Sequence, residues 1–242
     1  MSLLADEAVD IEYSVRVSPR ARRLLLKVSR RGEVEVVLPR GVARREAAAF
    51  VAAHRAWVIE QRQYYLQQHG PAASAARPPT IEFAATAQCW RIDYRASPRG
   101  RVVATLQDQQ PALLVYAADD AAVGRTLQRW LQGQARHHLL PWLQQVSQET
   151  GLRYRSATVR GQKTRWGSCT RDGDISLNRS LLFLAPELVH YLFIHELCHT
   201  RVMSHSARYW REVARFAPDY RDRERALHHA VDQVPLWASS GS

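Results

Sequence analysis

The sequence has little cysteine and no long uninterrupted apolar run. Its three cysteines, Cys89, Cys169 and Cys198, are an odd number without the spacing of a disulfide framework, so we expect a reducing compartment. The longest apolar stretch, residues 181–198, contains proline, glutamate and histidine, which excludes a membrane span. Residues 1–7 turn acidic too early for a secretory signal. These absences predict a cytoplasmic protein that does not enter a membrane.

Two kinds of phosphate site are also missing from the sequence. It contains no glycine-rich loop of the Walker type and no cluster of aspartate and glutamate suited to Mg²⁺. A hydrolase acting on nucleotide phosphoanhydrides is therefore the weaker alternative for function. The hydrophobic fraction of 46% and the charged fraction of 24% are ordinary for a globular protein, and the length allows one or two domains.

Acidic residues are outnumbered, because 34 lysines and arginines face 23 aspartates and glutamates, for a formal charge of +11. A basic surface attracts phosphates in a salt-dependent way. We therefore consider nucleic acid or a nucleotide as a partner, besides a protein or peptide substrate. The basic residues gather in two clusters: Arg16, Arg20, Arg22, Arg23, Lys27, Arg30 and Arg31, and then Arg153, Arg155, Arg160, Lys163, Arg165, Arg171 and Arg179.

The most informative pattern that is present runs from His195 to His205. Histidines four residues apart lie on one face of a helix, so His195 and His199 can bind the same ion. Glu196 is turned about 100° from His195, and its carboxylate can reach a water on that ion. Zn²⁺ in a catalytic site takes three protein ligands and leaves the fourth position to water. The pattern predicts a zinc-dependent hydrolytic site with His205 as third ligand and Glu196 as general base.

The residues before this motif strengthen the prediction of a metal site. Residues 188–194 are almost entirely apolar, so the helix that they begin should be largely buried. Buried histidines and a buried glutamate need partners, and a metal supplies one for each. A purely structural zinc site would usually have four ligands, often cysteine, and no adjacent glutamate.

The third ligand has alternatives. A carboxylate from a later helix, Glu212 or Glu224, could take the place of His205. We favour His205 because residues 203–206 are typical of a loop followed by a helix start with Ser206 as N-cap. Such a loop can fold the imidazole back onto the metal.

The remaining chain predicts an α+β protein in four parts. Residues 1–70 form an antiparallel β-meander plus a helix, with strands at 13–17, 24–28 and 34–38 and the helix at 44–67. Residues 71–80 are rich in proline and alanine and form a linker. Residues 81–118 are β-rich. Residues 119–242 begin with a helix to about residue 150, capped by Asp119 and bent or divided by Pro141, and continue with strands at 157–160 and 175–177.

Several separate motifs resemble the YgjP-like metallopeptidase family, described as metal-dependent hydrolases related to SprT-like and other zincin proteases. The resemblance covers residues 13–236 and rests on residues 15–23, 57–58, 165–169, 174–178, 181, 191–199, 205 and 209–210.

The resemblance implies a zincin-like catalytic domain in residues 119–242, with His195, His199 and His205 as zinc ligands and Glu196 as the base. It implies a metallopeptidase that cleaves amide bonds with metal-activated water, with a nucleic-acid-associated protease as an alternative. The strand at 175–178 should flank the cleft and could hold a peptide. Arg165, Arg208 and Tyr209 are candidates for binding the substrate or the developing oxyanion.

Overall fold

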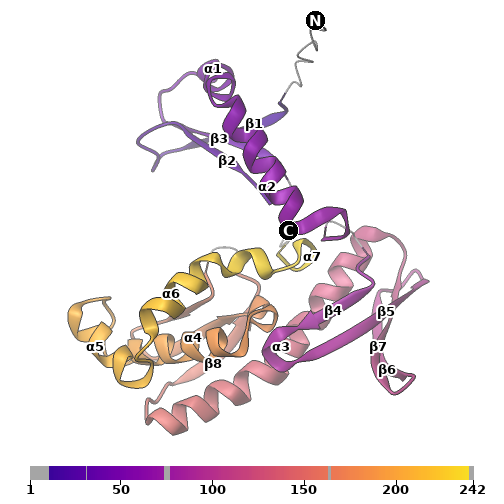
Figure 1. The fold of residues 1–242 in the computed structure, drawn as a ribbon, viewed down its shortest axis with the longest axis vertical. Coiled ribbons are helices and arrows are strands. Elements are labelled where there is room, and N and C mark those ends of the chain that lie inside the picture. Colours follow the sequence, from indigo (N-terminus) through magenta and orange to yellow (C-terminus); the bar gives the residue numbers. More distant parts are fainter. Residues whose placement is uncertain (1–10, 31, 74–76, 163–164, 240–242) are drawn as a thin grey trace, which may run out of the picture. The chain divides into compact units, whose positions relative to one another are not determined.

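The computed structural model describes residues 11–30, 32–73, 77–162 and 165–239. Arg31 and Lys163 of the predicted basic clusters, and the N-terminal residues 1–7, lie outside the described residues. The chain is a mixed α+β protein, as predicted, and divides into two compact units, residues 1–74 and residues 75–242 (Figure 1). The predicted β-rich segment 81–118 and the predicted catalytic region therefore lie in the same unit.

The first unit is a small sheet with two helices. In chain order its elements are β1 (Tyr13–Ser18), β2 (Leu25–Val28), β3 (Val34–Pro39), α1 (Glu46–Ala53) and α2 (Arg55–Ala73). The prediction of an antiparallel meander is wrong, because β1 pairs with β3 in parallel and the strand order is β1-β3-β2. The physical reason is burial: Val34, Val36, Val37 and Leu38 make β3 the most apolar strand, so it takes the centre and leaves the edges to the more polar strands.

The helical part of the first unit also differs from the prediction. The single helix expected at 44–67 is two helices, which are separated at His54 with φ −110° and ψ 17°. The second helix continues through Gly70 and Pro71 into the predicted linker and ends at Ala73. Residues 74–76 of that linker are outside the described residues.

The second unit begins with a four-stranded sheet of order β4-β5-β7-β6. Its elements are β4 (Thr80–Phe83), η1 (Ala84–Thr86), β5 (Gln88–Ala96), β6 (Arg101–Gln107) and β7 (Gln110–Ala117). Asp108 and Gln109 join β6 to β7 with positive φ angles of 50° and 63°, as a two-residue hairpin requires. These four strands make up the segment that was expected to be β-rich.

Helix α3 (Asp120–Thr150) connects the parts of the second unit. Trp130 in its first half stacks on Phe83, and Trp142 in its second half meets Phe193 edge to face. Pro141 was expected to bend or divide the helix, and division does not occur, because α3 continues through the proline as one helix. A buried stripe on both sides of the proline holds the two halves against the same core and offsets the lost hydrogen bond: Leu127, Leu131, Ala135, Leu139, Leu143 and Val146.

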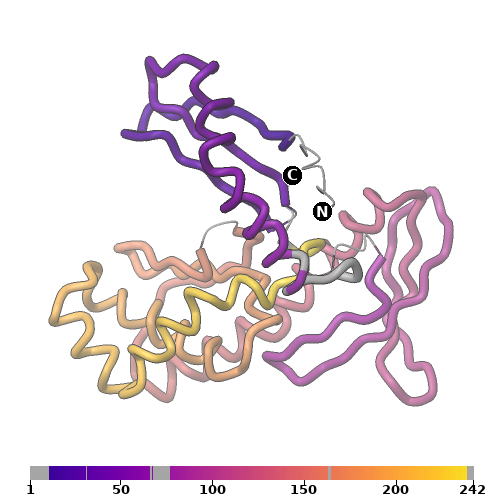
Figure 2. Tube along the Cα trace, turned by 45° about the horizontal axis from the view of Figure 1, so that its top comes forward, coloured from indigo at the N-terminus to yellow at the C-terminus, as the bar shows by residue number. Residues whose placement is uncertain are grey.

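After α3 comes a second, three-stranded sheet followed by the C-terminal helices. The elements are β8 (Ser156–Arg160), β9 (Gly167–Cys169), β10 (Asp174–Asn178), η2 (Arg179–Phe183), α4 (Pro186–His199), α5 (Ala207–Phe216), α6 (Tyr220–His229), η3 (Ala230–Gln233) and α7 (Leu236–Ser239). Strand β10 is central, parallel to β8 and antiparallel to β9. Figure 2 shows the yellow segment with α6 beside the orange segment with α4.

One apolar cluster joins both sheets, α3 and α4 of the second unit. The first unit has a smaller cluster of its own, formed by β3, α1 and α2. In the described part of the chain, no helix is both long enough and apolar enough to cross a membrane.

The cap of α3 gives the first testable prediction. The Asp119 carboxylate accepts a hydrogen bond of 2.7 Å from the backbone N–H of Ala122, and this N–H would otherwise lack a partner. We expect Asp119→Ala to lower the free energy of unfolding by about 1 kcal/mol, measured by urea denaturation. Asp119→Asn is the control, because asparagine also caps. Equal stability of all three proteins would contradict a capping role.

Candidate metal centre

Helix α4 is buried on almost every side. It begins with Pro186 in the first turn, where the missing N–H of proline costs nothing. Its buried apolar residues are Leu188, Val189, Tyr191, Leu192, Phe193, Ile194, Leu197 and Cys198. Yet Glu196 is only 4% exposed and His199 only 7% exposed. The sequence therefore places polar side chains inside an apolar environment, where they need partners.

Three histidines converge at the C-terminal end of α4. His195 and His199 come from the helix, and His205 comes from the loop that leads into α5. One ring nitrogen from each of the three lies within 4.8 Å of the others. Nε2 of His205 is 3.3 Å from Nε2 of His195. The structure thus brings together the three residues that the motif predicts as ligands.

The other ring nitrogens of the two α4 histidines face protein oxygens. Nδ1 of His199 lies 3.2 Å from the carbonyl oxygen of Val202, which can only accept, so Nδ1 carries the proton. Nδ1 of His195 is buried without a hydrogen bond and lies 3.8 Å from Oε2 of Glu224. Both arrangements leave Nε2 with a free lone pair toward the centre. Burial, followed by the charges of His199 and His205, lowers the pKa of His195 to about 3, so this ring is neutral.

Helix α5 fixes the three imidazoles from one side. The Tyr209 ring stacks on His199 with centroids 4.4 Å apart, and its hydroxyl donates a 3.0 Å hydrogen bond to the backbone oxygen of His195. The neighbouring Trp210 stacks on His205 at 5.6 Å. Ser206 stands at the N-cap position of this helix, although its side chain makes no capping hydrogen bond. Packing against aromatic rings therefore sets the position of the third histidine.

The two alternative ligands have other partners. Glu212 forms ion pairs with Arg201 at 2.6 Å and with Arg215 at 3.0 Å. Glu224 on α6 accepts a 2.5 Å hydrogen bond from the Tyr191 hydroxyl and faces the outer nitrogen of His195. Neither carboxylate belongs to the group with metal-ligand spacing among the described residues. Glu224 instead lies behind His195, with Oε2 3.8 Å from the outer ring nitrogen.

Glu196 lies against strand β9. A Cβ atom added to Gly167 would be 2.5 Å from Oε1 of Glu196 and 2.9 Å from its Cγ and Cδ, closer than real Cβ contacts. Only glycine lets the strand approach the carboxylate this closely. The sequence analysis singled out residues 165–169 but could not assign this role to the glycine, because nothing in the local pattern shows what faces it.

Burial raises the pKa of Glu196 to about 8, an effect that Arg165 opposes and Glu224 reinforces. The charge of Arg165 thus acts on the carboxyl group of Glu196, and its predicted role toward the substrate or the oxyanion stays a prediction. Tyr209 is buried, and its hydroxyl donates a hydrogen bond to the His195 carbonyl. Tyr209 therefore supports the position of His195. Arg208 is exposed on α5, without a hydrogen bond or ion pair to the described residues of the centre.

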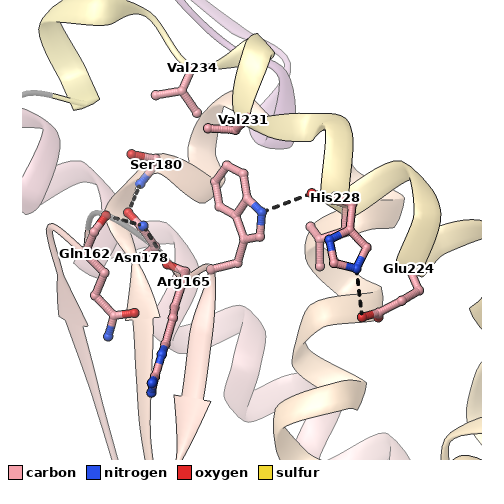
Figure 3. A pocket seen from close by; sticks show the side chains of 10 residues that line it. Gln162, Arg165, Asn178, Ser180, Glu224, His228, Val231 and Val234 are labelled. Carbon is pink, nitrogen blue, oxygen red and sulfur yellow. Dashed lines mark hydrogen bonds and ion pairs between the residues drawn. The ribbon is translucent and has the colours of Figure 1, made fainter. Parts of the chain in front are cut away.

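A cavity of about 370 Å³ lies beside Glu224 and Arg165 (Figure 3). Trp166, Leu227, Val231 and Val234 give it apolar walls. The Trp166 ring is fixed because its Nε1 donates a 3.1 Å hydrogen bond to the Leu227 backbone oxygen. Figure 3 shows Glu224 and His228 on one side and Gln162 and Arg165 on the other, which form the polar part of the lining. The cavity can accept a side chain that is mainly apolar.

The cysteines take no part in this centre. Cys198 is buried and burial raises its pKa to about 12. Cys169 on β9 has its pKa raised to about 11, first by burial and then by the charges of Glu196 and Asp174. Both thiols therefore stay protonated, which excludes them as nucleophiles at neutral pH.

The family of the chain follows from comparison with known proteins. A family model described as the YgjP-like metallopeptidase domain matches residues 22–230. Because this range covers most of the sequence, the chain belongs to the YgjP-like metallopeptidase family, which confirms the resemblance of its motifs. Membership supports a hydrolase of the metallopeptidase class.

The other comparisons add no information about function. A search of curated proteins found no match. Among solved structures, the crystal structure of the metallopeptidase zymogen of Pyrococcus abyssi abylysin is 23% identical, with a TM-score of 0.36, and the match covers 40% of this chain and 99% of that chain. A likeness at this level transfers no function.

The geometry of the histidines predicts one metal ion for each chain. We expect His205→Ala to weaken the binding of zinc by at least about tenfold, measured by competition with a chromophoric chelator. His190→Ala is the matched control, since His190 is also on α4 but outside the group of ligand atoms. Unchanged affinity in His205→Ala, or an equal loss in His190→Ala, would contradict this ligand set.

Proposed function

We propose that this protein is a zinc-dependent metallopeptidase that hydrolyses amide bonds with Glu196 as general base. The observation that carries the proposal is the convergence of three imidazoles from α4 and the following loop next to a buried glutamate of the same helix. Three ligands leave a coordination position open, whereas a structural zinc site would usually have four.

The spacing of one pair of histidine nitrogens matches that of zinc ligands. Nitrogens bound at about 2.0–2.1 Å to a tetrahedral Zn²⁺ are about 3.3 to 3.4 Å apart, and the two Nε2 atoms of His195 and His205 are 3.3 Å apart. The bond of His199 to the Val202 carbonyl fixes the orientation of that ring, whereas Nδ1 of His195 has no hydrogen-bond partner. When bound, zinc would act as a Lewis acid and lower the pKa of water to about 7.

Glu196 is the residue that moves the proton. Its carboxyl group packs against Gly167, and a bound cation would favour the charged form, so that the carboxylate can accept the proton of the attacking water. It then returns this proton to the leaving amide nitrogen. Arg165 is the remaining candidate for stabilising negative charge on the carbonyl oxygen.

The substrate chain would lie along β9. Strand β10, which was expected to flank the cleft, has no free edge for a peptide, since it is bonded on both sides by β8 and β9. Among the described strands β9 pairs with β10 alone, so its other edge is available for an extended peptide. The neighbouring cavity would hold an apolar side chain of that peptide.

The general base gives the central prediction. We expect Glu196→Gln to bind zinc as well as the wild type but to lose at least about 100-fold in peptide hydrolysis, because the ligands remain and only the base is lost. The measurements are zinc content and turnover on a mixture of fluorogenic peptides and denatured protein. Glu187→Gln, in the first turn of α4, is the control. Undiminished turnover in Glu196→Gln would reject the mechanism.

The contact between β9 and Glu196 gives a second prediction. In Gly167→Ala the new methyl group must displace the carboxylate, so we expect hydrolysis to fall by at least about tenfold while zinc content stays the same. Ser168→Ala, one residue along the strand, should retain activity. Full activity in Gly167→Ala would show that the carboxylate tolerates displacement, against the role given to this glycine.

A further inference from the structure

A second groove of the same unit consists of residues that take no part in the metal centre. It has a volume of about 640 Å³ and lies between the first half of α3, the β5–β6 turn and the start of η2. Four arginines line it, Arg125, Arg129, Arg136 and Arg179, and no carboxylate does. A concave surface with charge of a single sign concentrates ligands of the opposite sign.

The arginines of α3 form a row. Positions 125, 129 and 136 are separated by four and seven residues, so they lie within about 40° of each other around the helix axis. With a rise of about 1.5 Å per residue, the row is about 16 Å long. One strand of a nucleic acid presents a phosphate about every 3.4 Å along the axis. The row therefore has the length of several consecutive phosphates, and it is too long for one phosphate group.

The positive charges of this row are not neutralised within the described part of the chain. Arg125 and Arg136 form no ion pair there, and Arg129 donates only to the Gly100 backbone oxygen at 3.3 Å and to Thr126 at 3.4 Å. The nearest carboxylates along the sequence are used elsewhere. Asp119 caps α3, and Asp120 forms a 2.7 Å ion pair with Arg77.

Arg179 lies at the inner side of the groove and is half-buried. Burial lowers the pKa of its guanidinium group. Its Nη atoms reach only the backbone oxygens of Gln128 at 3.5 Å and Ala238 at 3.4 Å, and its Nε is buried without a hydrogen bond. A cation taken out of water without a counter-ion is costly unless an anion completes the site.

Two glycines make room for these arginines. A Cβ atom on Gly161 would be 2.9 Å from Cζ of Arg179, and one on Gly100 would be 2.5 Å from Oγ1 of Thr126 and 3.2 Å from Nη2 of Arg129. The backbone is therefore packed tightly around the guanidinium groups on two sides. Arg179 is half-buried in the wall of the groove, whereas Arg129 is exposed and lines it.

We propose that this groove binds the phosphodiester backbone of a nucleic acid, without reading its sequence. The aligned arginines match a row of phosphates, and the lining contains no aromatic side chain on which a base could stack. A membrane surface is flat and does not fit a concave site. An acidic peptide shares the charge but has no fixed spacing of its carboxylates, and a nucleoside triphosphate is shorter than the row.

The test compares two double variants with the same net charge. R125Q/R136Q removes the exposed ends of the row, and R153Q/R171Q removes two exposed arginines outside the groove. Fluorescence anisotropy measures the binding of labelled DNA and RNA of about 20 nucleotides between about 50 and 200 mM salt. We expect R125Q/R136Q to bind about 10- to 100-fold more weakly at 50 mM salt, with a salt slope lower by about 1.5. The control should bind like the wild type.

Each measurement in this experiment supports or overturns the proposal. Binding of either DNA or RNA with the expected loss supports the proposal, and comparison of the two shows which source of phosphates is preferred. No binding by the wild type, or equal losses in both double variants, overturns it. Competition by poly-glutamate or by inorganic tripolyphosphate as strong as that of unlabelled oligonucleotide, at matched charge, also overturns it. Zinc content is measured alongside and should be unchanged, since these arginines do not touch the metal centre.

Discussion

The candidate metal centre depends on one constraint, the burial of helix α4. A helix surrounded by apolar side chains cannot leave a carboxylate and two imidazoles to water, so each polar atom must meet a partner inside the protein. Most atoms do so: His199 reaches Val202, and the carbonyl of His195 accepts from Tyr209. Nδ1 of His195 stays without a hydrogen bond, and no protein cation is paired with the inward-facing Nε2 atoms and the Glu196 carboxylate among the described residues. A cation at that point would satisfy both at once, because it binds the nitrogens and stabilises the charged form of the acid.

The surrounding elements fix these groups from different parts of the sequence. Strand β9 presses Gly167 against Glu196, α6 places Glu224 behind His195, and α5 stacks Trp210 on His205. Metal ligands whose outer nitrogens and ring faces are held in this way lose little freedom on binding, which favours a single geometry. The same packing explains why an exposed residue such as His205 can still be a well-placed ligand.

Sequence patterns predicted the features that depend on residues close together in the chain. The capped helix after Asp119, the alternating strands of residues 81–118 and the ligand spacing from His195 to His205 all follow from neighbours in sequence. The errors and omissions concern contacts between distant segments. Nothing near β1 indicates that it pairs in parallel with β3, and nothing near Gly167 indicates that a carboxylate from α4 lies against it. Glu224 was considered for its chemistry, but its place behind His195 depends on how α6 packs.

For charge, too, the composition and the structure lead to different conclusions. The excess of arginine indicates an anionic partner, but much of it is internally used: Arg16 pairs with Glu35, and Arg155 pairs with Asp174. The clusters of basic residues in the sequence therefore overstate the free positive charge of some surfaces. The row on α3 is not evident from the sequence, because its members are four and seven residues apart. Both sites of this protein are recognised by one criterion, a polar or charged group held in place by packing and left without a partner. At α4 the proposed partner is a cation, and at α3 the proposed partner is an anion.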